Sequence, residues 1–252
     1  MGVYLPRWVW TGAVVLACIA GMVNVIGYLG FEHLAVSHVT GTTSLLGAAL
    51  ARGDWGDVGQ LWAVLIAFSL GAMLSGLLVQ DSSLRLGPRY GVALALEAVL
   101  LVAAVPMFER QQLAGALLAA MACGLQNAMV TTYSGAVVRT THLTGMFTDL
   151  GIGLGHLLRG MPLQVRRLSL SALVISGFLA GGVAGSWLFA VYEYRALLVP
   201  ALLTGATGSG YVLYRNLRLS TPTGARSAPG KDADEGTGNP LDRDRSQSPP
   251  ER

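Results

Sequence analysis

Charged residues are scarce in this chain. Only 12% of its 252 residues are Asp, Glu, Lys or Arg, whereas about a quarter is normal for a soluble domain. Apolar residues make up 52% of the sequence, and the mean hydropathy is +0.53. These values exclude an ordinary soluble globular protein and predict a protein that lies in a lipid bilayer, its principal partner.

Cysteine is nearly absent, and the motifs that identify most enzymes are missing. Cys18 and Cys123 lie within apolar runs, which is typical of packing residues rather than of disulfides or metal ligands. The spacing of the four histidines is not that of a metal site. The alternative left open is a haem held between His38 and His142. The sequence has no nucleophile elbow, zinc-protease motif, phosphate loop or dinucleotide-binding glycine motif. We therefore expect no enzyme activity, no cofactor and no metal.

The few charges are unevenly distributed. Residues 219–252 hold five basic and six acidic side chains, which leaves 12 Arg and 8 acidic residues for the first 218. We interpret the net charge of +3 as a membrane-topology signal and expect no nucleic-acid partner. The polar composition of residues 219–252 predicts a disordered cytoplasmic tail, because such a segment cannot bury enough apolar surface to offset its ordering entropy.

The most informative pattern is a phrase that occurs twice. His38-Val-Thr-Gly-Thr-Thr-Ser-Leu-Leu-Gly47 is echoed 104 residues later by His142-Leu-Thr-Gly-Met-Phe-Thr-Asp-Leu-Gly151. An Asn precedes each phrase, and the two Asn residues, Asn24 and Asn127, are 103 positions apart. The match divides the membrane region into two related repeats, residues 1–110 and 111–218.

Each repeat contains three apolar segments that are long enough to cross a bilayer, which takes about 20 residues. The six predicted spans are about 8–30, 61–79, 90–107, 113–132, 170–192 and 196–213. A shorter apolar stretch, 40–51 or 144–158, follows the first span of each repeat and is too short to cross as a helix. The predicted fold is an all-α multi-pass membrane bundle of about six spans and two short, broken or re-entrant helices.

The positions of the arginines favour one topology over another. With six spans, nine Arg fall on one side of the membrane and three on the other, whereas eight spans give eight and four. Six spans with cytoplasmic termini is therefore our prediction, and eight spans is the alternative. Because three spans per repeat is an odd number, the second repeat would enter the membrane from the opposite side, which predicts inverted repeats.

Small residues also recur at helical spacing. Gly177, Gly181 and Gly185 are four residues apart, as are Gly71 and Ser75. Small residues at this spacing let helices approach closely in lipid. We expect them to pack helices within one subunit, although a contact in a homo-oligomer would use the same pattern.

The repeated phrases carry the candidate solute site. Thr40 and Thr144 stand just before apolar helical runs and are predicted N-caps, while Gly41 and Gly145 let a backbone or a ligand approach closely. The free N–H groups of two helix ends in mid-membrane would suit an anion or a polar group. The other residues assigned to this site are Asn24, His38, Asn127, Arg139 and His142. Alternatively, these residues only satisfy backbone groups where the chain is broken in lipid, and the amides bond helix to helix.

Two acidic side chains are predicted to lie deepest in the membrane. Glu97 is about seven residues into the third span, and Asp149 is on the short helix of the second repeat. An ionisable group at this depth is a candidate for proton or ion coupling. For Asp149, an ion pair with an Arg is an equally strong interpretation.

Two stretches resemble a known family. The region around Ser37-His-Val-Thr-Gly41, and the region from Gly124-Leu-Gln-Asn-Ala128 through Arg139-Thr-Thr-His-Leu-Thr-Gly145, resemble the two signature regions of the YoaK-like family of bacterial integral membrane proteins. That family is defined as a domain of unknown function, and the resemblance covers about residues 10–217. It implies a six-span protein of the bacterial inner membrane and supplies no substrate. Thr42 departs from the pattern, which leads us to expect Asn after the first Thr-Gly.

These observations predict a secondary transporter or carrier for a small polar or anionic solute, with its site between two half-helix N-termini. Movement of one repeat against the other would give alternating access. The alternative is a non-transporting membrane scaffold or partner subunit. A membrane-embedded enzyme ranks last, because the sequence displays no nucleophile or metal triad.

Overall fold

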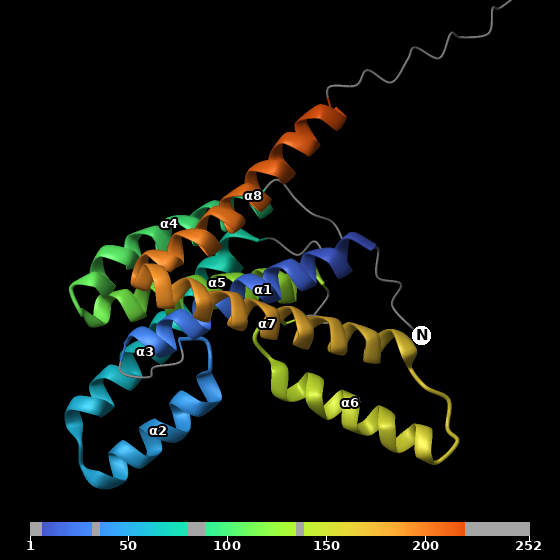
Figure 1. The fold of residues 1–252 in the computed structure, drawn as a ribbon, viewed down its shortest axis with the longest axis horizontal. Helices are drawn as coiled ribbons and strands as arrows, with labels where there is room; N and C mark the ends of the chain where they lie inside the picture. Colours follow the sequence, from blue (N-terminus) through green and yellow to red (C-terminus); the bar gives the residue numbers. More distant parts are fainter. Residues whose placement is uncertain (1–6, 32–35, 80–88, 135–138, 220–252) are drawn as a thin grey trace, which may run out of the picture.

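The computed structural model describes residues 7–31, 36–79, 89–134 and 139–219. Within these residues the chain forms eight α-helices and one 3-10 helix, without a β-strand (Figure 1). They are α1 (Arg7–Gly30), α2 (Val39–Arg52), α3 (Trp55–Leu78), α4 (Arg89–Glu109), α5 (Leu113–Tyr133), α6 (Leu143–Leu158), α7 (Val165–Tyr192), η1 (Glu193–Leu197) and α8 (Leu198–Leu219). The predicted all-α multi-pass bundle is confirmed. The predicted disordered tail lies outside the described residues from Ser220 onward.

Five stretches of the described chain are long and apolar enough to cross a membrane, namely Val9–Gly30, Trp55–Leu78, Arg89–Glu109, Leu113–Tyr133 and Val165–Leu213. The last has 49 residues and contains α7, η1 and most of α8. One straight helix of that length would measure about 74 Å, more than twice the thickness of the hydrocarbon core. The chain instead turns at η1, so this stretch holds two helices. The five stretches thus contain the six long helices that the sequence predicts as spans.

Two of these helices begin earlier than predicted, α3 at Trp55 instead of Leu61 and α7 at Val165 instead of Leu170. The sequence boundaries follow apolarity, whereas a helix also continues through a polar first turn. Asp54 caps α3, since its side chain accepts a hydrogen bond from the backbone N–H of Asp57 at 3.2 Å.

The buried side chains gather in two clusters, one at each end of the bundle, and these clusters give the direction of each helix. The Phe108 end contains Phe108, with Phe31, Val58, Ala116 and Leu197. The Tyr90 end contains Tyr90, with Val9, Val79, Tyr133 and Leu170. By this placement α1, α4 and α7 run from the Tyr90 end to the Phe108 end, while α3, α5 and α8 run in the opposite direction.

The packing pairs the first helix of one repeat with a helix of the other. α1 packs along α7, and α3 packs along α5. α4 contacts α5 and α8, whereas the short helices pack within their own repeats, α2 on α3 and α6 on α7. In Figure 1 these two hairpins lie on the same side of the bundle, opposite α4 and α8. The two repeats are therefore interleaved and do not form separate packed units.

Glycines allow α1 and α7 to touch backbone to backbone. A Cβ atom on Gly181 would lie 1.9 Å from the carbonyl oxygen of Cys18, and one on Gly21 would lie 2.1 Å from that of Phe178. No real Cβ atom could occupy either position, so only glycine permits this approach. These contacts pack helices within one subunit, as expected from the spacing.

The interface between α3 and α5 repeats this arrangement residue by residue. A Cβ atom on Gly71 would lie 1.9 Å from the carbonyl oxygen of Met121, and one on Gly124 would lie 2.0 Å from that of Phe68. Each α5 residue follows its α1 counterpart by 103 positions, and each α7 residue follows its α3 counterpart by 110. The same two glycine contacts thus occur at both interfaces. α5 takes the place of α1, and α3 takes the place of α7.

The short helices are also alike. α2 has 14 residues and α6 has 16, which correspond to about 21 Å and 24 Å, less than the roughly 30 Å of the hydrocarbon core. Both end in an Arg-Gly pair, Arg52-Gly53 and Arg159-Gly160, whose glycines have φ angles of 71° and 67°. A glycine in this left-handed conformation is a common helix terminator, and it turns each short helix back toward the long helix that follows.

Candidate functional site

The N-termini of α2 and α6 differ from the prediction in one respect. The N-cap residues are His38 and His142, and neither side chain makes a capping hydrogen bond. Thr40 and Thr144 are the second residues of their helices and are exposed, so the prediction that they are N-caps is wrong. The physical reason is that Val39 and Leu143 are already helical, which leaves each Thr hydroxyl beside the first turn and not ahead of it.

Gly41 and Gly145 make room for these histidines. A Cβ atom on Gly41 would lie 2.3 Å from Cδ2 of His38, and one on Gly145 would lie 2.5 Å from Cε1 of His142. Each imidazole therefore lies against the first turn of its own helix. The space that we expected a ligand to use is occupied by the ring, and this packing explains the spacing between His and Gly in the repeated phrase.

Asn24 has a structural role at the approach to α2. Its Oδ1 accepts hydrogen bonds from the backbone N–H of Ser37 at 3.2 Å and from the Ser37 hydroxyl at 2.7 Å. These bonds tie the residues just before α2 to α1. The predicted counterpart, Asn127, behaves differently, because its Oδ1 is buried without a hydrogen-bond partner among the described residues.

The tether in the second repeat uses the neighbouring amide, Gln126. Its Oε1 accepts a hydrogen bond from the hydroxyl of Thr140 at 3.2 Å, just before α6. The tethered residues are 13 positions apart in the first repeat and 14 in the second. Each residue of the second tether stands one position before the residue that the sequence repeat aligns with the first tether, Asn127 or Thr141, so the repeat by itself does not identify Gln126.

A polar cluster is buried where α4, α5 and α8 meet. Glu97 is 2% exposed, and its Oε1 accepts hydrogen bonds from Nε2 of Gln126 at 2.8 Å and from the Thr204 hydroxyl at 3.5 Å. The other carboxyl oxygen, Oε2, is buried and has no partner in the described part of the chain. Sequence reasoning selected Glu97 but missed Thr204, because a single Thr in an apolar helix gives no signal by itself.

A cavity of about 200 Å³ lies at the Tyr90 end. Its walls are Val9, Gly12, Ala13, Leu16, Tyr90, Val130, Tyr133, Ser134, Thr207 and Tyr211. The ring of Tyr90 meets those of Tyr133 and Tyr211 edge-on, with centroids 5.2 Å apart in both pairs. The cavity is thus lined by apolar side chains, three tyrosine rings and two hydroxyl-bearing residues.

Helical spacing places the Glu97 cluster beyond this cavity. Tyr90 precedes Glu97 by seven residues on α4, and Tyr133 and Tyr211 follow Gln126 and Thr204 by seven on α5 and α8. Residues seven apart share a face of a helix and are separated by about 10 Å along its axis. The buried carboxyl group therefore lies about two helical turns deeper than the tyrosine rings, on the same faces of the same three helices.

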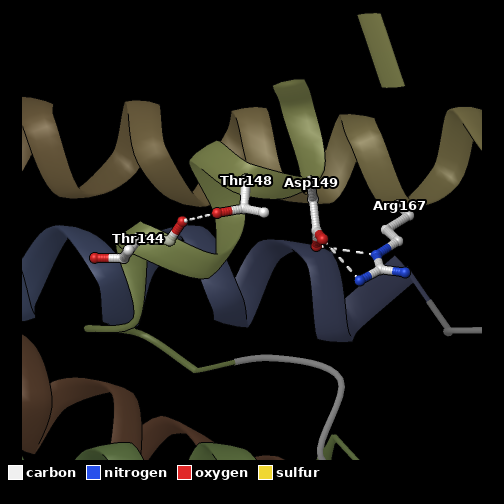
Figure 2. A network of polar contacts seen from close by, with 4 residues as sticks. All are labelled: Thr144, Thr148, Asp149 and Arg167. Carbon is white, nitrogen blue, oxygen red and sulfur yellow. Dashed lines mark hydrogen bonds and ion pairs between the residues drawn. The ribbon is translucent and has the colours of Figure 1, made fainter. Parts of the chain in front are cut away.

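Asp149 forms an ion pair between α6 and α7 (Figure 2). Its two carboxyl oxygens accept hydrogen bonds from Nε and Nη2 of Arg167 at 2.9 and 2.7 Å. The Thr148 hydroxyl beside it donates to the backbone carbonyl of Thr144 at 2.9 Å. The ion pair accounts for Asp149 without a coupling role, which is the alternative that we weighed equally from the sequence.

The structure divides the sequence-predicted residues among several places. His38, Thr40, Arg139, His142 and Thr144 are exposed, and the helices they belong to or precede pack on different partners, α3 and α7. Glu97 is in the bundle interior, together with Gln126 and Thr204. The one predicted residue that lies in a buried polar cluster of several helices is Glu97.

Long apolar helices, close glycine contacts and a polar cluster in the bundle interior define a multi-pass helical membrane protein. Residues 12–209 match the family described as "Protein of unknown function (DUF1275)", and the chain belongs to this family. It is 33% identical over 141 residues to the UPF0700 transmembrane protein YoaK of Bacillus subtilis (strain 168). That alignment covers 54% of this chain and 63% of the relative, so the match spans less than two thirds of the relative's length. No solved structure matches the chain. The family resemblance noted in the sequence is confirmed.

Proposed function

We propose that this protein is a secondary transporter, a carrier for a small polar or anionic solute, built from two inverted repeats. The observation that carries the proposal is the equivalence of the α1–α7 and α5–α3 interfaces, which pair the same positions with the repeats exchanged. Since α1 and α5 run in opposite directions, a twofold axis in the plane of the membrane would relate the two repeats, as in inverted-repeat carriers. Carriers with inverted repeats expose one site alternately to each side when the two repeats exchange conformations.

The interior of the bundle also supports a carrier. Burying a carboxyl group in a membrane protein is costly, and such residues commonly mark a solute or ion pathway. Among the described residues Oε2 of Glu97 has no hydrogen-bond partner, and a cavity lies about two helical turns away on the same helix faces. A bundle that served only as a scaffold would gain stability if this position were apolar.

The short helices would supply the solute site. Because the rings of His38 and His142 cover Gly41 and Gly145, the solute would bind beside the histidine and threonine side chains and not against the glycines. In Figure 1 their N-terminal ends point toward the middle of the bundle, and their C-terminal ends point away from it. The free N–H groups at these ends attract anions and polar groups, and the exposed hydroxyls of Thr40 and Thr144 add donors and acceptors there.

The non-transporting alternative also has support. Asn24 bonds Ser37, each histidine packs on its glycine, and Asp149 pairs with Arg167. These contacts give structural roles to many residues of the repeated phrases. We prefer the carrier because none of them accounts for Glu97.

Topology provides the first test. We expect the bacterial inner membrane as the location, with the Tyr90 end at the cytoplasm, since the arginine distribution favours cytoplasmic termini. Single cysteines at Leu50 of α2 and Leu154 of α6, which are equivalent and exposed, would be introduced after Cys18 and Cys123 are replaced by Ala. An impermeant thiol reagent applied to intact cells should label Leu50→Cys, and Leu154→Cys should react only in inverted vesicles. Labelling of both from one side would refute the inversion.

Uptake provides the second test. Purified protein in liposomes would be assayed for counterflow of phosphate, lactate, glycine and glucose, with protein-free liposomes as the baseline. Thr40→Val and Thr144→Val should each reduce uptake of the transported solute about tenfold, which corresponds to the loss of one hydrogen bond of ordinary strength. Thr43→Val is the matched control, because its hydroxyl is already bonded to the carbonyl of Val39 at 2.8 Å. Equal effects of all three variants, or no uptake above baseline, would favour the scaffold.

A further inference from the structure

Gln126 connects Glu97 on α4 with the residues just before α6. Its Nε2 donates to Glu97 in the bundle interior at 2.8 Å, and its Oε1 accepts from Thr140 at 3.2 Å. Thr140 is fully buried and stands two residues before His142, the N-cap of α6. One amide side chain thus forms a chain of hydrogen bonds from the Glu97 carboxyl group to the start of the short helix.

The described part of the first repeat has no such chain. The residue equivalent to Gln126 is Val23, which is apolar and buried. The tether before α2 runs from Ser37 to Asn24, and no further hydrogen bond from the Asn24 side chain to an acidic group occurs within the described residues. The repeats are therefore alike in their helix packing but differ in how their short helices are held.

We propose that Glu97 is the proton-binding group of the protein, and that its protonation is transmitted through Gln126 and Thr140 to the N-terminus of α6. This proposal rests on the proposed carrier function and assigns its coupling ion, a proton, and the repeat that responds to it. Oε2 of Glu97 has no hydrogen-bond partner in the part of the chain that the structure describes, and its lone pair can take up the proton. The cavity at the Tyr90 end provides the approach, since it lies along the same faces of α4, α5 and α8.

The strength of hydrogen bonds explains the transmission. A bond from an amide to an ionised carboxylate is roughly twice as strong as one to a neutral carboxyl group, and bonds in a chain reinforce one another in an interior of low polarity. When Glu97 is ionised, Gln126 is held firmly and in turn holds Thr140. When Glu97 takes up a proton, both bonds weaken and the start of α6 is released.

The side chains around Glu97 support its assignment as the group that binds the proton. Within the described ranges, the titratable side chains that interact electrostatically with Glu97 are Tyr90 on its own helix and Cys123 on α5. α8 contributes the hydroxyl of Thr204. Among the described residues Glu97 forms no ion pair, and the pair between Glu109 and Arg195 is about three helical turns away along α4, at the Phe108 end.

A pair of matched thiol reporters tests the proposal. Leu143 and Val39 are the first residues of α6 and α2. Leu143→Cys and Val39→Cys would each be made after Cys18 and Cys123 are replaced by Ala. Because thiol reactivity itself changes with pH, the measured quantity is the ratio of the labelling rate at position 143 to that at position 39, in purified full-length protein. Between pH 9 and pH 5 the ratio should rise about fivefold, the effect of losing a charge-assisted bond.

Variants identify the responsible group. Glu97→Gln cannot ionise, so its ratio should be high and independent of pH, and Gln126→Met should also abolish the pH dependence. Glu109→Gln, an exposed acid on the same helix, should respond as the parent does. Should Glu97→Gln fail to fold, Gln126→Met tests the same chain.

Other results would overturn the proposal. A ratio that does not change with pH in the parent would do so, as would a pH response that persists in Glu97→Gln or Gln126→Met. A response to sodium ions at constant pH, without a response to pH, would assign a different ion. The labelling ratio is measured without a solute. A negative result for the proton proposal can therefore be distinguished from a negative result for the carrier proposal, which the uptake assay tests.

Discussion

Gly181→Ala should destabilise the protein by about 3 kcal/mol, the upper end of the usual cost of overpacking, because the neighbouring atom is backbone. The added methyl group would lie 1.9 Å from the carbonyl oxygen of Cys18. That neighbour is backbone, so the contact can be relieved only if α1 and α7 move apart along much of their length. The expected result is a lower midpoint of thermal unfolding in detergent and a smaller yield of monodisperse protein.

The adjacent glycine provides the control. A Cβ atom on Gly182 would have no neighbour within 4 Å, so Gly182→Ala should stay within about 1 kcal/mol of the parent, with a small gain from the better helix propensity of Ala. Gly71→Ala and Gly76→Ala repeat this comparison on α3, since Gly71 faces Met121 and Gly76 faces open space. If Gly181→Ala were as stable as Gly182→Ala, the close approach of the helices would be wrong. Different costs for Gly181→Ala and Gly71→Ala would argue against equivalent interfaces.

Tyr194→Ala is expected to have the second large effect, a loss of about 3 kcal/mol, as for other buried aromatic residues. Tyr194 lies in η1, where the chain reverses between α7 and α8. Its ring stacks on Phe108 at a centroid distance of 5.2 Å and meets Phe189 edge-on at 5.6 Å. Its hydroxyl donates to the carbonyl of Gly30 and accepts from Nε2 of Gln111 at 2.9 Å. One side chain thus holds the ends of α1, α4 and α7 together.

Two variants separate the ring from the hydroxyl. Tyr194→Phe keeps the stacking and should cost about 1 kcal/mol through the lost hydrogen bonds. Tyr192→Ala, two residues away and 58% exposed, should change the stability by less than about 0.5 kcal/mol, as is usual for surface positions. The assignment of Tyr194 as the tie between these helices requires that its Ala variant unfold at a clearly lower temperature than Tyr192→Ala.

The helices and their number could be predicted from the sequence because both depend on local properties. A run of about 20 apolar residues is enough to form a spanning helix, and the twofold phrase is visible as spacing alone. The boundaries of α3 and α7 were less accurate, because a polar first turn continues the helix without an apolar signal. The N-cap prediction failed for a related reason, since where a helix starts depends on backbone angles that the residue types at Thr40 and Thr144 do not fix.

The candidate site was only partly predictable. Glu97 could be selected because a lone acid in an apolar span is conspicuous. Its partner Thr204 is 107 residues away, and nothing in the local sequence of α8 distinguishes that Thr from others. Gln126 was noticed as a polar residue in a span, but its neighbour Asn127 matched the repeat better, and only the structure shows which amide faces both Glu97 and Thr140.

The sequence by itself determined that this is a helical membrane protein with two related halves and where its spans and short helices lie, because hydropathy, length and repetition act locally along the chain. The tertiary structure decided which helices meet, that glycines bring α1 against α7 and α3 against α5, and that one buried carboxyl group is connected to the start of α6. Apart from the hydrogen bond between Gln126 and Thr140, which are 14 positions apart, these contacts join residues about 30 to 160 positions apart. They depend on how closely whole helices approach in lipid, where packing and interhelical hydrogen bonds take the place of the hydrophobic effect.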